Sequence, residues 1–286
     1  MTLIVLGASN LDYTLIAHQA LRQGHSNPAS LAVHAGGVGR NVAETLGRLG
    51  ESLTLLTALT PGVWREFIVA SLPRCVRLES LPIPTQSSYV ELLDQHHDLH
   101  LGLAAMDALD ALTPESLAPF LSQVEEAQWL AIDLNFPAPL IDWVIKHFKG
   151  ELFVEGTSAA KVFKILPHLN RVHTLKLNDK EAFELTQEVQ PSAQAQMLIN
   201  QGVQAVTITL GKEGVYHQTK TQKGTHHPSL PHPNIVSTTG AGDAYFAGLV
   251  YAHLHHLEPH QFASRLAHTA LSVATPVNPS LSLSTI

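Results

Sequence analysis

Cysteine and positive charge are both scarce in this chain, and each shortage excludes a class of protein. The 286 residues include one cysteine, Cys75, so no disulfide framework can hold the fold. Lysine and arginine number 17 against 24 acidic residues, which gives a formal net charge of -7. Surfaces that bind nucleic acid are typically basic. We therefore expect no nucleic-acid partner.

Long apolar runs are also absent. No stretch approaches the roughly 20 apolar residues that span a bilayer. The segment 1–12 lacks the basic start of a signal peptide and has the pattern of a first strand. We expect a cytoplasmic protein with no membrane partner. Hydrophobic residues make up 45% of the chain and charged residues 14%, which is typical of a globular protein with a large core.

Strand-like apolar runs alternate with amphipathic segments along most of the chain. The strand-like runs are 2–7, 52–58, 128–132, 151–155, 172–175 and 204–210. Helical spacing occurs at 38–50, 63–71, 138–148, 179–187, 191–201, 241–256 and 259–274. This alternation predicts an α/β domain of three layers, in which helices cover both faces of a mostly parallel sheet.

Two segments break this alternation. Residues 13–34 and 74–103 contain extended alternating runs with no helix between them, which predicts a small antiparallel β lid inserted in two pieces. Ligands of open α/β sheets bind at the carboxyl ends of the strands, where a lid can cover them. The whole chain, 1–286, is then a single domain. The edge of the lid offers a surface for a possible homodimer.

Three glycine-rich turns are candidates for binding a phosphate. AGGVGRNVA (35–43) has glycines spaced as in dinucleotide-binding proteins, but the strand after it ends without the required acidic residue. TLGKEGVY (209–216) lies between two strands and by itself predicts a plain hairpin turn. No P-loop sequence occurs anywhere in the chain.

The third turn, in STTGAGDAYFAGLV (237–250), is followed at once by a carboxylate. The first N–H groups of a helix have no internal partner and together carry about half a positive charge. Gly240, Ala241 and Gly242 have little bulk to keep an anion from these groups, and Asp243 can accept a proton. Phosphoryl transfer requires both. The alternative is an ordinary helix start capped by Ser or Thr.

Five motifs in order resemble the PfkB, or ribokinase-like, family of carbohydrate and nucleoside kinases. They are GASNLD (7–12), GGVGRNVAETLGRLG (36–50), KLNDKEAFELT (176–186), TLGKEG (209–214) and TTGAGDAYFAG (238–248). Together they cover nearly the whole chain. The resemblance implies a ribokinase-like fold and transfer of phosphate from ATP to a sugar or nucleoside hydroxyl, with Mg²⁺ as cofactor.

The resemblance also implies roles for single residues. Asp243 would be the catalytic base, and the amides of Gly240, Ala241 and Gly242 the anion hole. The residues implied around the substrate are Asn10, Asp12, Gly37, Asn41, Asn135 and, on the lid, Tyr89. Those implied around ATP are Asn178, Thr209, Gly211, Gly214 and His268, with Glu181 holding Mg²⁺ through water.

The chain also departs from the family pattern. Many relatives carry aspartate where this chain has Ser237, and that side chain helps to form a monovalent-cation site, so a role for K⁺ is left open. Glu155-Gly156-Thr157 replaces the more usual Asp-Pro-Val.

The sequence leaves two alternatives to a kinase. One is a non-catalytic nucleoside-binding protein, and the other is a metal hydrolase that uses some of the 18 histidines. The presence of Asp243 and Glu181 favours a kinase.

Overall fold

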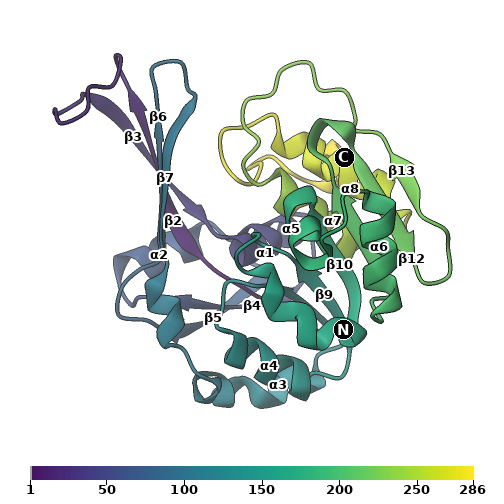
Figure 1. Cartoon of the computed structure of the whole chain (residues 1–286). Helices are drawn as coiled ribbons and strands as arrows, with labels where there is room; N and C mark the ends of the chain where they lie inside the picture. Colours follow the sequence, from purple (N-terminus) through teal and green to yellow (C-terminus); the bar gives the residue numbers. More distant parts are fainter. Residues whose placement is uncertain (1) are drawn as a thin grey trace.

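The computed structural model describes residues 2–286 and has a nine-stranded sheet at its centre (Figure 1). The strand order is β13-β12-β11-β10-β9-β8-β1-β4-β5. The strands are β1 (Leu3–Leu6), β4 (Leu53–Leu59), β5 (Val76–Pro82), β8 (Trp129–Asp133), β9 (Glu151–Glu155), β10 (Val172–Asn178), β11 (Ala205–Thr209), β12 (Val215–Thr219) and β13 (Thr225–His227). From β5 to β11 neighbouring strands are parallel, while β12 and β13 are antiparallel. The predicted mostly parallel sheet is confirmed.

Helices cover both faces of this sheet. They are α1 (Val38–Arg48), α2 (Val63–Ala70), α3 (Leu121–Glu126), α4 (Ala138–His147), α5 (Asp179–Thr186), α6 (Pro191–Asn200), α7 (Ala241–Leu254) and α8 (Pro259–Ala270). All seven predicted helices are present, and α3 was not predicted. The alternating side chains of β1 show the layering, because Ile4 and Leu6 belong to one apolar core and Leu3 and Val5 to the other. A strand buried on both faces has a continuous apolar sequence.

A second, four-stranded sheet forms the lid. Its order is β3 (Ala29–Gly36), β2 (Asn10–Ala17), β6 (Ser88–Leu93), β7 (Leu99–Ala105). The pairs β2/β3 and β6/β7 are antiparallel as predicted, and β2 and β6 join them through a parallel pair. The predicted second segment, 74–103, was wrong at its start. Its first strand, β5, pairs with β4 in the large sheet because Val76 and Leu81 are buried there.

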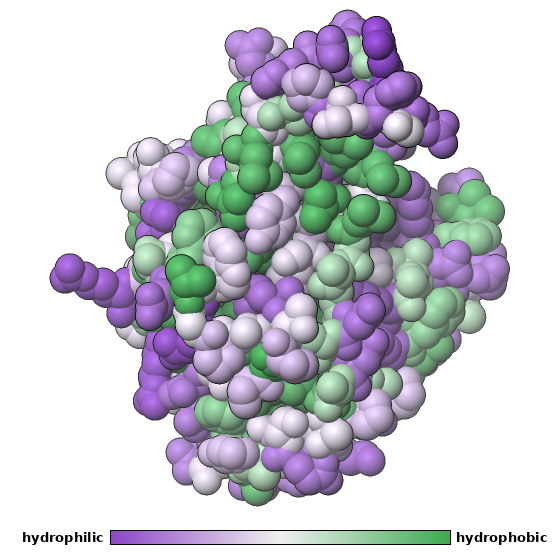
Figure 2. Space-filling view, turned by 90° about the vertical axis from the view of Figure 1, so that its left-hand side faces the viewer, coloured by the Kyte–Doolittle hydropathy of each residue, from purple (hydrophilic) through white to green (hydrophobic). Residues whose placement is uncertain are grey.

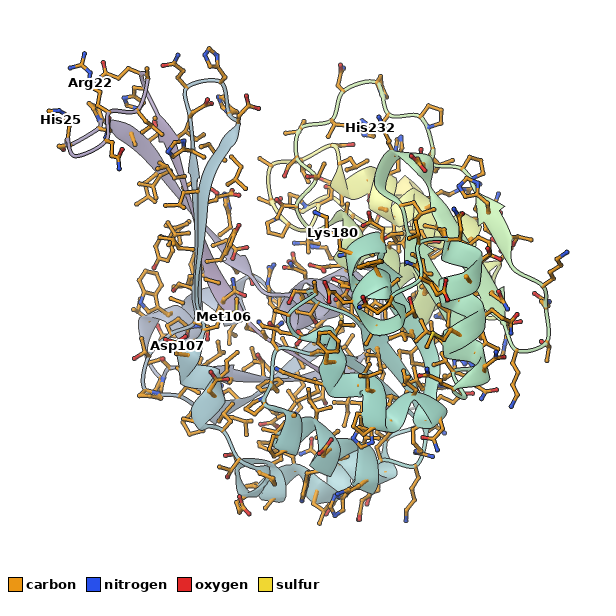
Figure 3. All side chains as sticks on the ribbon, in the orientation of Figure 1. Arg22, His25, Met106, Asp107, Lys180 and His232 are labelled. Carbon is orange, nitrogen blue, oxygen red and sulfur yellow. The ribbon has the colours of Figure 1, made fainter. Side chains whose placement is uncertain are left out.

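The lid extends away from the rest of the protein, with Arg22 and His25 at the tip of its first hairpin (Figure 3). Figure 2 views the lid side and shows hydrophobic side chains gathered below the hydrophilic tips. Leu99, Leu101 and Leu103, which alternate along β7, are 60%, 49% and 55% exposed. Within residues 2–286, the outer edges of β3 and β7 have no neighbouring strand. A homodimer through this edge stays a prediction.

None of the helices in residues 2–286 has the length and apolar sequence needed to cross a bilayer.

Candidate active site

The carboxyl ends of the parallel strands bring together residues that are far apart in sequence. Asn10 follows β1, Asn135 follows β8, and Glu155 ends β9. Asn178 ends β10 and is the N-cap of α5. All these strands run in the same direction, so their last residues lie along one edge of the sheet.

Helix α7 begins at this edge with a backbone that only glycine can provide. Gly240 is its N-cap with a φ of 80°, and a Cβ there would lie 2.0 Å from the carbonyl oxygen of Pro276. A Cβ on Gly242 would lie 3.1 Å from Nζ of Lys176. The residues that the structure describes include no side-chain cap on α7, so the alternative of a Ser- or Thr-capped helix start is not supported. The start of α7 therefore combines close backbone approach with a nearby positive charge.

Asp243 lies in the first turn of α7 and is held in place by a single amide. Nδ2 of Asn41 donates a hydrogen bond to Oδ2 of Asp243 over 2.8 Å. Burial, reinforced by the charge of Glu155, raises the pKa of Asp243 to about 7. A carboxyl group with this pKa is a suitable general base near neutral pH. A large fraction of it is ionised there, and the carboxylate is basic enough to take a proton from a hydroxyl group.

A buried ion pair, which the sequence reasoning missed, lies beside Asp243. Nζ of Lys176 is 2.5 Å from Oε1 of Glu155, and both residues are almost fully buried. The other carboxylate oxygen of Glu155 accepts a hydrogen bond from the amide of Thr157. Burial opposes the charge of Lys176, yet Glu155 and Glu181 raise its pKa, so the ammonium group stays charged. It supplies a fixed positive charge next to the predicted anion hole.

Two signals in the sequence pointed to this pair. Lys176 lies between two leucines in the strand VHTLKLN, and Glu155 follows the apolar run LFV in the strand ELFVE. A charge within a buried strand requires a partner on a neighbouring strand. The adjacency of β9 and β10, which decides the partner, is not visible in either segment alone.

Glu181 and Asn178 hold each other at the start of α5. The side chain of Asn178 accepts from the Glu181 amide over 2.9 Å, and the Asn178 amide donates to Oε2 of Glu181 over 2.8 Å. Burial is the main cause that raises the pKa of Glu181 to about 7, and the negative charge of Glu155 is the second. A Cβ on Gly156 would lie 2.5 Å from Oε2 of Glu181. The glycine that departs from the family pattern thus makes room for this carboxylate.

Asn10, Asp12 and Gly37 meet where the lid joins the large sheet. Nδ2 of Asn10 donates to Oδ1 of Asp12, whereas Oδ1 of Asn10 is buried without a hydrogen-bond partner in residues 2–286. Gly37 has a φ of 97°, and a Cβ there would lie 2.7 Å from this orphan oxygen. Burial raises the pKa of Asp12 to about 7, partly offset by Arg40. A buried acceptor without a donor fits a ligand hydroxyl.

Tyr89 lies on the lid next to Asp12. The two residues are directly paired in the parallel register of β6 and β2, so their side chains point to the same face. The Tyr89 hydroxyl lies over Gly102 of β7, where a Cβ would be 2.5 Å from it. The glycine on β7 therefore leaves space for the aromatic ring on the lid.

Asn135 is positioned by a second acid that the sequence reasoning missed. The Asn135 amide donates to Oδ1 of Asp133, and Oδ1 of Asn135 accepts from Nζ of Lys161 over 2.6 Å. Oδ2 of Asp133 accepts from the amides of Ala8 and Gly39, over 2.8 and 2.9 Å. Asp133 thus links the end of β8 to the turns that carry Asn10 and Asn41.

A cavity of about 510 Å³ opens against the start of α7. Its walls include four of the five residues predicted around ATP and two of the three predicted in the anion hole: Thr209, Gly211, Gly214, His268, Ala241 and Gly242. The fifth, Asn178, does not line the cavity, and its side chain donates a hydrogen bond to Glu181.

Two residues from the sequence analysis lie in the wall of this cavity or next to it in the chain. The His268 ring lies 4.3 Å from that of His232, centroid to centroid, and Nε2 of His268 is 3.0 Å from the carbonyl oxygen of Pro231. Ser237 accepts from the amide of Thr239 over 3.1 Å and brings no carboxylate to this region.

Kinases from other organisms are similar to this chain over most of its length. A pseudouridine kinase from Escherichia coli is 28% identical over 300 residues, which cover 99% of this chain and 94% of the relative. A ribokinase from Staphylococcus aureus is 25% identical over 86% of this chain and 84% of its own. The structure of a carbohydrate kinase from Agrobacterium tumefaciens superposes with a TM-score of 0.87 at 24% identity, over 100% of this chain and 95% of that one.

The family model described as pfkB family carbohydrate kinase matches residues 2–282. The two sheets, the glycine turn before Asp243 and the capped Glu181 lie within this match. The chain therefore belongs to the pfkB family of carbohydrate kinases.

Proposed function

We propose that this protein is an ATP-dependent kinase that phosphorylates the 5′-hydroxyl of pseudouridine. The observation that carries the proposal is the position of Asp243. Its partly buried carboxyl lies in the first turn of α7 and accepts a hydrogen bond from Asn41, and the adjacent Ala241 and Gly242 line the 510 Å³ cavity. The choice of substrate is supported by the pseudouridine kinase that matches nearly the whole chain. The motifs GGVGRN (36–41), SSYVELLD (87–94) and FVEGTSAAK (153–161) also resemble those of pseudouridine kinases.

The proposed reaction uses Asp243 and the start of α7 in one step. Asp243 accepts the proton of the 5′-hydroxyl, whose oxygen forms a bond to the γ-phosphorus of ATP. The bond from that phosphorus to the bridging oxygen breaks, and ADP leaves with the electron pair. The amides of Gly240, Ala241 and Gly242, together with Lys176, stabilise the negative charge on the transferred group. Asp243 then releases its proton to water.

The residues around Glu181 fit a magnesium ion. Magnesium prefers oxygen ligands and keeps several of its waters, so one carboxylate is sufficient to hold it through water. Both oxygens of Glu181 are oriented by Asn178, and a carboxyl with a raised pKa gains from a nearby cation. When bound, the ion neutralises phosphate charge. Asn178 and Gly156 keep the Glu181 carboxylate in place.

A free sugar such as ribose is the alternative substrate, supported by the similarity to a ribokinase. Asn10 and Asp12 would bind hydroxyl groups in either case. Tyr89 distinguishes the two, because an aromatic ring on the lid face of Asp12 can stack on the flat base of a nucleoside. Free ribose has no such base.

The substrate proposal is tested by transfer of phosphate from radiolabelled ATP to pseudouridine, uridine, adenosine, ribose and fructose. We expect kcat/KM to be highest for pseudouridine, and Tyr89→Ala to lower it by about tenfold or more for nucleosides while leaving any residual turnover of ribose unchanged. Phe163→Ala is the matched control, because it removes an exposed aromatic ring that lies outside the lid. A preference for ribose or fructose would assign the enzyme to the sugar kinases instead.

The pKa of Asp243 predicts how turnover depends on pH. The base must be ionised, so kcat/KM should rise about tenfold per pH unit below pH 7 and level off above it.

The free energy of unfolding should change with pH in the opposite direction. Folding raises the pKa of Asp243 from 3.8 to about 7, so the folded protein binds more protons, and the free energy of unfolding falls as pH rises through this range. Activity and thermal unfolding measured at matched pH values test both trends, and a rate that is flat across pH 7 would contradict the assignment.

A further inference from the structure

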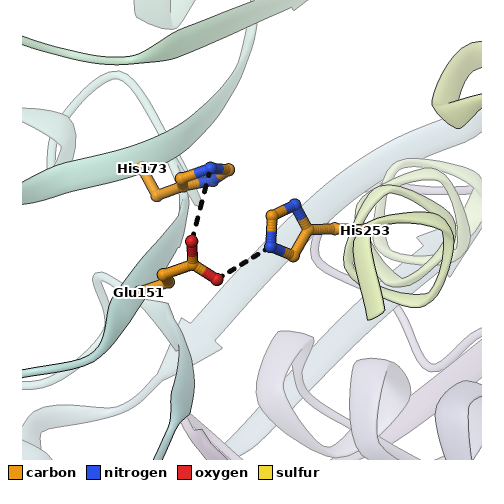
Figure 4. A group of neighbouring side chains, drawn as sticks. All are labelled: Glu151, His173 and His253. Carbon is orange, nitrogen blue, oxygen red and sulfur yellow. Dashed lines mark hydrogen bonds and ion pairs between the residues drawn. The ribbon is translucent and has the colours of Figure 1, made fainter. Parts of the chain in front are cut away.

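A second cluster of polar side chains lies at the amino ends of β9 and β10, the opposite end of these strands from Asp243. It consists of Glu151, His173 and His253 (Figure 4). Glu151 is the first residue of β9, and His173 is the second residue of β10. His253 lies in the last turn of α7. Nε2 of His253 is 2.8 Å from Oε2 of Glu151, and Nε2 of His173 is 3.9 Å from Oε1. Three separate elements thus direct one potential metal ligand each to the same point.

The chemistry of these ligands matches a zinc-type ion. The three ligand atoms all lie within 4.8 Å of one another, close enough to move onto one ion. Two imidazoles and one carboxylate, with a further position left for water, are a common ligand set for Zn²⁺. Magnesium and calcium prefer oxygen ligands, so two imidazoles select against them. The side chains of His173, His253 and Glu151 are 28%, 33% and 46% exposed, so an ion from solvent can reach them.

Neighbouring groups already orient the ligands. Nδ1 of His173 is 2.9 Å from the hydroxyl of Thr174, which leaves Nε2 to face Glu151. Nε1 of Trp129 donates to Oε2 of Glu151 over 3.0 Å. The ring of Phe153 packs 5.3 Å from the His173 ring and 5.2 Å from the His253 ring, centroid to centroid. Outer contacts of this kind fix ligand orientation in metal sites.

We propose that Glu151, His173 and His253 form a binding site for a divalent transition-metal ion of the zinc class. The ion would tie the end of α7 to β9 and β10. The same three elements carry Asp243, Glu155 and Lys176 at their opposite ends. The site therefore stabilises the packing of α7 on the sheet from the side away from the cavity.

Thermal unfolding with and without Zn²⁺, in the presence of excess Mg²⁺, tests this site. We expect saturating Zn²⁺ to raise Tm by about 5 °C, since an ion that binds only the folded state stabilises it by mass action. His253→Ala and His173→Ala should abolish the rise and weaken Zn²⁺ binding, measured by calorimetry, about 100-fold. Bound Co²⁺ should show the visible absorption of a four- or five-coordinate ion, and both variants should lose it.

His255→Ala is the matched control, because the chain contains 18 histidines that could bind metal weakly. His255 follows α7 and pairs with Glu51 over 2.6 Å, but no third ligand joins them in residues 2–286. This variant should keep the full response to Zn²⁺. Glu151→Gln, which retains an acceptor for Trp129 and His253, should weaken Zn²⁺ binding without unfolding the protein. Equal Zn²⁺ responses in the original protein, His253→Ala and Glu151→Gln would overturn the proposal, as would a missing response in the original protein.

Discussion

Asp243→Asn is expected to lower kcat by about 10³-fold, because the amide cannot accept the proton of the attacking hydroxyl. The affinities for nucleoside and ATP should change by less than about tenfold, since the amide oxygen can still accept the hydrogen bond from Asn41. Steady-state kinetics together with calorimetric binding of each substrate separate these two effects. Asp142→Asn on α4 is the matched control, because Asp142 pairs with His168 away from the cavity.

The same variant should be more stable than the original protein at alkaline pH. Desolvation and the charge of Glu155 both oppose the ionised form of Asp243, so removal of the carboxylate relieves an unfavourable charge. We expect Tm to rise by about 3 °C at pH 8 and to change little at pH 5, where the carboxyl is protonated in the folded protein. A variant that retains full turnover would exclude Asp243 as the base, whatever its stability.

Gly240→Ala is expected to lower kcat/KM at least about 100-fold and Tm by about 8 °C. The φ of 80° is unfavourable for alanine, and the new Cβ would lie 2.0 Å from the carbonyl oxygen of Pro276. The backbone must therefore move, which displaces the amides that line the cavity and the carboxylate of Asp243. Displacement of a catalytic group by about 1 Å is sufficient for a 100-fold loss.

Gly50→Ala provides a matched control for the backbone strain. Gly50 has a similar φ of 94°, but it lies between α1 and β4, and a Cβ there would contact nothing within 4 Å. This substitution should lower Tm by about 3 °C through strain alone and leave kcat/KM unchanged. Equal losses of activity in the two variants would show that strain, and not the position of the α7 start, determines turnover.

The sequence predicts the large sheet well because each parallel strand carries its own local signal. Runs such as LIVL in β1 and ELFVE in β9 are apolar enough to require burial on both faces. β5 was misplaced in the lid because its sequence, VRLESLP, alternates like that of a half-exposed strand. β5 is the last strand of the large sheet, and within residues 2–286 its outer side pairs with no other strand, which weakens the apolar signal.

The candidate site was predictable where one short motif supplies both the backbone and the chemistry. The turn at 240–243 is such a motif, and so is the Asn178–Glu181 cap. Asp133, Glu155 and Lys176 have meaning only once β8, β9 and β10 are neighbours, which follows from packing of the whole chain. The paired histidines of the proposed metal site were missed for the same reason, because 80 residues separate His173 from His253.

The central position of β1 has a consequence for synthesis of the protein. Although it is the first strand to leave the ribosome, it pairs on one side with β4 and on the other with β8, which begins at Trp129. A nascent chain must therefore keep one edge of an apolar strand unpaired while more than a hundred further residues are added. Helix α7 joins later still. Such an intermediate is prone to aggregation, so the yield of folded enzyme in cells should depend on chaperones that shield this edge during translation.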